Sequence, residues 1–477
     1  MPPLDLAIRG GTIVTAAETR RADIAVADGK IVAIGEVGDA AVEHDATGLL
    51  VLPGVVDPHT HLEAQFRAGG PTTADDFLSG TEAAACGGVT TIIDYARQFP
   101  GASLSDGIRE WDSRAAPKSL IDYSFHIVVT DFSDASLAEV PALLADGFPS
   151  VKAFMMRVSD AELLNLMAAS AEAGGLVMAH AENTAVLDHQ KERLFAEGKK
   201  SAAWYVASRP ELGEAEATAR AIDYADLTGA TVCVVHLSCD AALQRARAAK
   251  ERGSRPWIEV RPCYLLLDAD RYTAEGVDPL TLSGCPPLRP AWNIERLWEG
   301  LADGTIDLVG SDHCSWRLAE KSVGAEDFSL IPHGIPALET QLPTLWSKGV
   351  NEAHGGGVTA NLLLEYPSNR FGHVSANRLV EAMSTAPAKL HGLYPRKGTI
   401  EVGSDADLVL FDPERRATVS QSRLHSRAGY EPCEGMEVIG WPVATFSRGE
   451  LIAKDGEVVG RPGRGQLLKR QPPPRQA

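Results

Sequence analysis

The sequence has 477 residues, with 45 Lys or Arg against 64 Asp or Glu, which gives a formal net charge of −19. Charged residues make up 23% of the chain and hydrophobic residues 44%, a balance that is typical of globular proteins and excludes a disordered one. Nucleic acids and anionic membranes bind basic surfaces, so the acidic excess argues against both as partners.

Targeting segments and disulfides are not indicated either. No run approaches the roughly 18 consecutive apolar residues of a membrane span, and Met1–Asp5 lacks the basic start of a secretory signal. The seven cysteines are an odd number without a Cys-x-x-Cys pair, which favours a reducing compartment over a disulfide framework. We therefore expect a cytoplasmic protein.

The two ends of the chain predict short β-strands. The Asp28-Gly29 pair between two apolar runs is a strong signal for a two-residue hairpin. Runs of the same kind return at Leu408–Phe411 and Val443–Phe446. We expect these segments to form one small β-sandwich, built from residues 1–53 and 393–465.

The middle of the chain, residues 54–392, has a different pattern. Eight continuous apolar runs recur there, most of them separated by stretches of helical character such as Asp160–Glu172. The runs are Val51–Val56, Val89–Tyr95, Tyr123–Val129, Val151–Met155, Leu176–Ala179, Thr231–Leu237, Trp257–Val260 and Ile306–Val309. Eight such units predict an α/β fold, the (β/α)8 TIM barrel. The proline-rich end, residues 466–477, is predicted to be a flexible tail.

Polar residues follow several of these strands, and the strand ends of a barrel converge on one face. His59 and His61 end the first strand, and their spacing puts both imidazoles on the same side of an extended chain. The others are Lys152 on the fourth strand, His180 after the fifth, His236 after the sixth and Asp312 after the eighth. A single histidine in such a place is more often a packed core residue than a ligand, but the joint occurrence predicts a metal centre.

Lys152 needs a chemical modification to take part in such a centre. An ammonium group has no lone pair and cannot bind a cation. After reaction with CO2 the side chain becomes an anionic carbamate, whose two oxygens can bridge two metals. Imidazole and carboxylate ligands suit zinc best, with manganese, iron or cobalt as alternatives. We therefore expect two divalent ions per subunit, with zinc as the first choice.

Motifs along nearly the whole chain add to this cluster. They lie at Leu52–Leu62, Ala74–Thr81, Gly87–Asp94, Val151–Met155, His180–Asn183, Ser208–Pro210, Val235–Ser238, Pro286–Arg289, Gly310–His313 and Pro395–Asp407. Together they resemble the binuclear amidohydrolases, and within them the dihydropyrimidinase/hydantoinase family. This resemblance implies hydrolysis of a cyclic amide or imide, a dihydropyrimidine or 5-substituted hydantoin, to an N-carbamoyl amino acid. It also implies a homo-oligomer, a dimer or tetramer.

The resemblance further implies a role for each residue of the cluster. His59 and His61 would hold the first metal, the carbamate of Lys152 would bridge, and His180 and His236 would hold the second metal. Asp312 would complete the first site, take the proton of a metal-bridging hydroxide and return it to the leaving ring nitrogen. Asp312 and Lys152 are thus the expected catalytic residues.

The residues expected to bind substrate depart from the family pattern. Arg157 stands where the family has a tyrosine, Cys285 where it has a serine, and His333-Gly334 where it has Asn-Gly. The loop after the first strand is longer and adds Arg67. We hypothesise that Arg157, with Arg67, clamps a substrate carboxylate, since guanidinium pairs bidentately with carboxylates. The alternatives are that Arg157 still donates to the oxyanion, or that its side chain has turned away and another group substitutes.

Other functions fit parts of the sequence. An allantoinase or dihydroorotase would be another cyclic amidase of the same superfamily. A mononuclear deaminase of the same barrel class would not need Lys152. A non-catalytic scaffold related to dihydropyrimidinase would have lost metal ligands, whereas all six candidates are present here.

Overall fold

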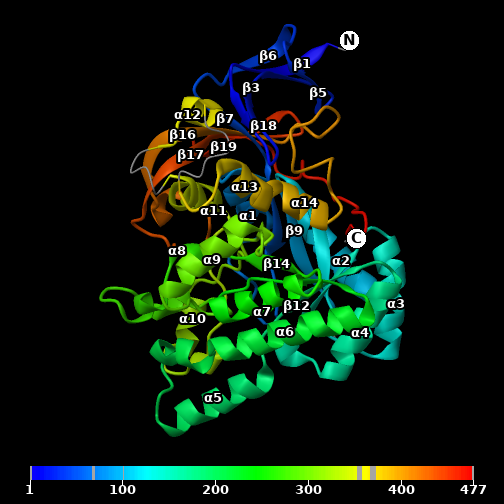
Figure 1. Ribbon diagram of the computed structural model, residues 1–477, viewed down its shortest axis with the longest axis vertical. Coiled ribbons are helices and arrows are strands. Elements are labelled where there is room, and N and C mark those ends of the chain that lie inside the picture. The colour runs from blue at the N-terminus through cyan, green and yellow to red at the C-terminus, as the bar shows by residue number, and fades with distance from the viewer. Residues whose placement is uncertain (1–2, 67–69, 100, 352–356, 366–371, 475–477) are drawn as a thin grey trace.

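The structure, a computed structural model, describes residues 3–66, 70–99, 101–351, 357–365 and 372–474. A barrel forms the larger part, and a two-sheet sandwich that contains both early and late segments of the chain lies beside it (Figure 1). The predicted (β/α)8 fold with a small sandwich is confirmed.

Eight parallel strands pair in chain order to form the barrel. They are β8 (Val55–Thr60), β9 (Val89–Arg97), β10 (Asp122–Val128), β11 (Ser150–Phe154), β12 (Leu176–His180), β13 (Thr231–Val234), β14 (Trp257–Val260) and β15 (Leu308–Val309). A bridge between Thr60 and His313 brings the first strand next to the segment after the eighth. Nearly every strand residue is buried, because the outer face packs on helices and the inner face fills the barrel.

Helices follow the strands, and most of them cover the outside of the barrel (Figure 1). Their bounds are α1 Phe77–Cys86, α2 Leu104–Ala115, α3 Asp134–Ala145, α4 Asp160–Glu172, α5 Thr184–Ala196, α6 Glu211–Thr228, α7 Asp240–Glu251, α8 Pro262–Leu266, α9 Trp292–Asp303, α10 Leu318–Lys321, α11 Gln341–Leu345, α12 Ala360–Glu365, α13 Ala376–Val380 and α14 Ala386–Leu390. A capping box of Ser159 and Glu162 starts α4 at the predicted residue. Among the described helices, none combines the length and apolarity needed to cross a membrane.

The sandwich is assembled from distant parts of the chain. One sheet orders the strands β5-β4-β1-β6 and the other β19-β18-β17-β16-β7-β2-β3. The bounds are β1 Leu4–Arg9, β2 Thr12–Val14, β3 Thr19–Arg21, β4 Asp23–Ala27, β5 Lys30–Gly35, β6 Ala40–Asp45, β7 Leu50–Pro53, β16 Leu408–Thr418, β17 Glu437–Ser447, β18 Glu450–Lys454 and β19 Glu457–Val458. Antiparallel pairing of β16 with β7 joins the late segment to the early one. The predicted boundaries after residues 53, 392 and 465 stay predictions.

The end of the chain differs from the predicted flexible tail. Leu468 donates its N–H to the carbonyl of Tyr123 at 2.7 Å, and Arg470 Nη2 donates to Ser150 Oγ at 2.7 Å. Both side chains are at most 2% exposed. In an extended segment, alternate side chains face the same side, so Leu468 and Arg470 together can anchor this one. The sequence therefore contains no longer apolar pattern that would predict the contact. Residues 475–477 lie outside the described part.

Candidate metal centre and active site

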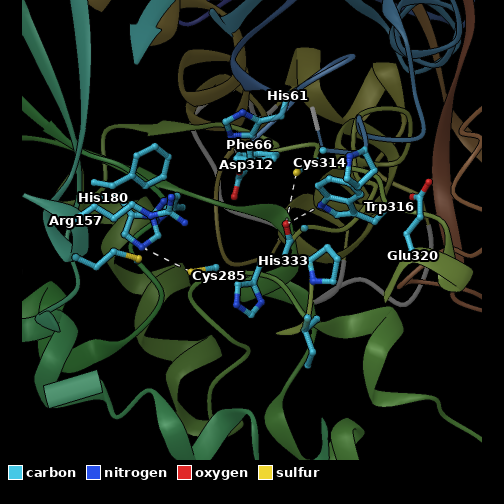
Figure 2. A pocket seen from close by; sticks show the side chains of 18 of the residues that line it. His61, Phe66, Arg157, His180, Cys285, Asp312, Cys314, Trp316, Glu320 and His333 are labelled. Carbon is cyan, nitrogen blue, oxygen red and sulfur yellow. Dashed lines mark hydrogen bonds and ion pairs between the residues drawn. The ribbon is translucent and has the colours of Figure 1, made fainter. Parts of the chain in front are cut away.

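The six candidate ligands lie together where the carboxyl ends of the barrel strands converge. His59 belongs to β8, Lys152 to β11 and His180 to β12, while His61, His236 and Asp312 follow β8, β13 and β15. All six line one cavity of about 660 Å³. Figure 2 shows His61, Asp312 and His180 facing this cavity.

His59, His61 and Asp312 form the tightest group. Their ligand-type atoms lie within 4.8 Å of one another, and Asp312 Oδ1 is 3.2 Å from Nε2 of each imidazole. Burial lowers the pKa of both histidines. The rings are therefore neutral near pH 7 and keep a nitrogen lone pair, which is the form that binds a metal.

A buried carboxylate on β14 orients His59. Glu259 Oε1 lies 2.6 Å from His59 Nδ1, and the same atom accepts the N–H of His236 at 3.0 Å. A hydrogen bond at Nδ1 leaves Nε2 as the lone-pair nitrogen and fixes the ring orientation. Glu259 thus positions one candidate ligand and the backbone of another.

His180, His236 and Lys152 continue the cluster. The ring centroids of His180 and His236 are 4.4 Å apart, and those of His236 and His59 are 5.5 Å apart. Within the described residues, three buried atoms of this cluster have no hydrogen-bond partner: His59 Nε2, Lys152 Nζ and His236 Nδ1. Leaving such atoms unpaired is costly, so their convergence fits a bound cation and a modified lysine.

The backbone at two of the candidate ligands is strained. His236 has a φ of 43° and Asp312 a φ of 47°. Such values are uncommon for residues other than glycine and concentrate at functional sites. Both residues with this backbone conformation line the cavity.

A separate network of hydrogen bonds holds His180. Its Nε2 lies 2.7 Å from Glu182 Oε2, which also accepts from Arg209 Nη1 at 2.5 Å and from Cys285 Sγ at 3.3 Å. Burial raises the pKa of the Cys285 thiol, so this thiol stays protonated and donates. Cys285 therefore helps to hold Glu182.

The four described candidates for substrate binding, Arg157, Cys285, His333 and Gly334, line the same cavity. Figure 2 shows Arg157 beside His180, and His333 near Cys285. The His333 ring stacks on Tyr205 with centroids 4.8 Å apart. Gly334 has a φ of 139°, and a Cβ there would lie 2.3 Å from the carbonyl oxygen of Cys314, so only glycine fits. Arg67 lies outside the described residues.

Sequence reasoning missed three charged residues at strand ends. Arg261, directly after β14, is fully buried and places Nη1 3.2 Å from Asp312 Oδ2. Burial alone would raise the pKa of Asp312, but the Arg261 charge and the two nearby imidazoles hold it well below its usual range. Glu259 and Arg97 also lie at or near strand ends. The rule that found the six ligands, a polar residue where a barrel strand ends, applies equally to these three.

The fold and the buried cluster define a barrel metalloenzyme, and comparison with known proteins specifies the class. The model of the amidohydrolase family matches residues 50–452. A D-hydantoinase of Geobacillus stearothermophilus is 39% identical over 472 residues, which cover 97% of this chain and 96% of that protein. The chain belongs to the amidohydrolase family, in its hydantoinase branch, as the motifs predicted.

Solved structures agree with this assignment. The D-hydantoinase from Bacillus sp. AR9 superposes with a TM-score of 0.91 at 41% identity and covers 98% of this chain and 99% of its own. The L-hydantoinase (dihydropyrimidinase) from Arthrobacter aurescens gives a TM-score of 0.87 at 32% identity, over 98% of this chain and 100% of its own. The family and the His/Asp group together support a divalent metal centre.

Proposed function

We propose that this protein is a metal-dependent hydrolase that opens the amide or imide bond of a dihydropyrimidine- or hydantoin-like ring and releases an N-carbamoyl amino acid. The observation that carries the proposal is the convergence of six ligand-type residues on one cavity, three of them with unpartnered buried atoms. The hydantoinase names of the relatives agree with this reaction.

The ligand set follows from the donor chemistry. We assign His59, His61 and Asp312 to a first zinc ion and His180 and His236 to a second. Imidazole nitrogen and carboxylate oxygen are ligands that zinc prefers. When bound, two divalent ions lower the pKa of water and polarise a carbonyl group.

Lys152 is the proposed bridging ligand, as its carbamate. Burial lowers its pKa to about 8, so part of the amine is unprotonated near neutral pH. The unprotonated amine is the form that reacts with CO2. Its Nζ atom is buried and has no hydrogen-bond partner among the described residues, which supports the modification.

Asp312 is the proposed general base. Oδ1 faces the imidazoles of His59 and His61, whereas Oδ2 lies 3.2 Å from Arg261, which holds the carboxylate ionised and oriented. In this role Asp312 takes a proton from the attacking water and returns it to the ring nitrogen that leaves. We further propose a homo-oligomer, a dimer or tetramer, which the family resemblance implies. A cytoplasmic location is proposed from the odd number of cysteines without a Cys-x-x-Cys pair.

A substrate screen tests this function. The protein is reconstituted with zinc and bicarbonate and assayed on dihydrouracil and on both enantiomers of 5-alkylhydantoins. Separate assays on allantoin and dihydroorotate test the two alternative activities. Metal-dependent ring opening of the dihydropyrimidine or the hydantoins is expected. Hydrolysis of only allantoin or dihydroorotate, or of nothing by the metal-loaded protein, would overturn the proposal.

A further inference from the structure

Two arginines line the cavity without an acidic partner among the residues that the structure describes. Arg97 ends β9, and Arg157 ends the short helix η1 (Met155–Arg157), and both face the same cavity as the candidate ligands. Neither guanidinium group forms an ion pair or a hydrogen bond with any residue in the described part of the chain. By contrast, Arg209 pairs with Glu182 at 2.5 Å, and Arg261 approaches Asp312.

The acids of the cavity are already engaged elsewhere. Among its described lining residues the carboxylates are Asp312 and Glu320. Asp312 contacts Arg261 and the imidazoles, and Glu320 pairs with Arg317 at 3.1 Å. No lining carboxylate is therefore left to neutralise Arg97 and Arg157.

The two guanidinium groups also act on each other. Burial, and then the positive charge of Arg157, lower the pKa of Arg97 to about 10. Guanidinium groups are cations in proteins, so like charges face one cavity in a chain of net charge −19. An anion bound between them would remove this repulsion.

The surroundings indicate where such an anion would sit. Arg157 Cζ lies 5.9 Å and Lys152 Nζ 5.4 Å from the ring centroid of Phe154. Both cationic groups thus lie within 6 Å of the same aromatic ring, so a substrate at the proposed reaction centre can reach Arg157 through a short side chain. Phe66 and Trp316 line the same cavity with ring centroids 5.9 Å apart, and they supply apolar surface for its methylene groups.

We propose that Arg97 and Arg157 form an anion subsite that selects cyclic amides whose exocyclic substituent ends in a carboxylate. The inference rests on the proposed function and names the substrate class of that site. Guanidinium groups bind carboxylates through paired, charge-assisted hydrogen bonds. The described Arg97 takes the place that the sequence hypothesis gave to Arg67.

The test compares two substrates that differ only in charge. Hydantoins with a 2-carboxyethyl or a 2-carbamoylethyl group at C5 are assayed with the zinc-loaded enzyme at low salt. We expect kcat/KM to favour the carboxylate by about 10- to 100-fold, since a hydrogen bond to a charged group contributes about 1.5–3 kcal/mol. Arg97→Gln and Arg157→Gln should each lower this preference by about tenfold, mainly through KM, and Arg157→Lys should restore part of it.

Controls separate this role from a structural one. Arg109→Gln, at an exposed position of α2 paired with Asp106, should leave the preference unchanged. As a second readout, inhibition by N-carbamoylglutamate relative to N-carbamoylglutamine should fall in the same variants. The subsite would be overturned if the wild type showed no preference, or if the preference survived in the double variant Arg97→Gln/Arg157→Gln. An equal loss of kcat for both substrates would also overturn it. If neither a hydantoin nor dihydrouracil is opened, the proposed function fails, and the ratio of the two inhibitor affinities still decides the subsite.

Discussion

Single residues behind the candidate ligands decide how well a metal is held, and Glu259 is the clearest case. Its Oε1 lies within hydrogen-bond distance of His59 Nδ1 and accepts the backbone N–H of His236, although Glu259 is not itself a proposed ligand. Glu259→Gln keeps the size of the side chain but replaces one carboxyl oxygen with an amide nitrogen, which cannot accept a hydrogen bond. We expect zinc affinity, measured by competition with a chelator, to fall by about 10- to 100-fold.

The matched control for this variant is Glu299→Gln, on the exposed face of α9, where Glu299 pairs with Arg296. It should leave zinc affinity at the wild-type value. An unchanged affinity in Glu259→Gln would mean that this hydrogen bond does not support the metal centre.

At the residue scale, the sequence predicts the candidate ligands but not what holds them. His59, His61 and Asp312 were found because each is a metal-binding residue type where an apolar strand ends. Glu259 is 200 positions from His59 in the chain, and only the closed barrel brings them together. Arg97 also ends an apolar strand, but an arginine is no metal ligand, so a pattern of ligand residue types does not include it.

At the scale of elements, the connection between the short helix η11 (Gln421–Arg423) and β17 buries a carboxyl group. Glu431 accepts the N–H of Cys433 at 3.1 Å, and burial raises its pKa to about 8. An unfolded glutamate loses its proton at about pH 4.3. Between these values the folded state binds more protons, so stability falls as pH rises, by up to about 1.4 kcal/mol per pH unit.

Replacing this group tests the linkage. Glu431→Gln is neutral at every pH, so its melting temperature should exceed that of the wild type at pH 8, and the difference should shrink toward pH 5. Glu437→Gln, at the exposed first residue of β17, is the matched control and should leave the melting temperature near the wild-type value at both pH 5 and pH 8. A pH-independent difference between Glu431→Gln and the wild type, in calorimetric scans, would show that this carboxyl group is ionised in the folded protein.

Strands and helices with a clear local sequence pattern agree with the predictions, whereas the last segment, which has no such pattern, does not. The helix α4 starts and ends at the predicted residues, and a capping box marks its first turn. The predicted runs overlap the eight barrel strands, although β15 has only two residues. The last segment was misjudged, because Leu468 and Arg470 anchor it through contacts with β10 and β11 that no local pattern reveals.

For the whole molecule, buried charges link the barrel to the sandwich. Lys397 Nζ lies 2.6 Å from Asp122, at the start of β10, and 2.7 Å from Asp407, which precedes β16. Lys397 and Asp122 are 275 positions apart in the sequence. Such a buried cluster is costly to break, so it fixes how the two parts dock. The sequence predicts both parts but contains no local pattern for this contact.

The central claim for the whole molecule is a pair of metals bridged by modified Lys152. The most direct test measures the metal content of the zinc- and bicarbonate-reconstituted chain together with its turnover of a 5-alkylhydantoin. We predict two zinc ions per chain in the wild type. In Lys152→Ala we predict at most one zinc ion and no turnover. Retained turnover in Lys152→Ala, or full wild-type activity with a single zinc ion per chain, would contradict the account.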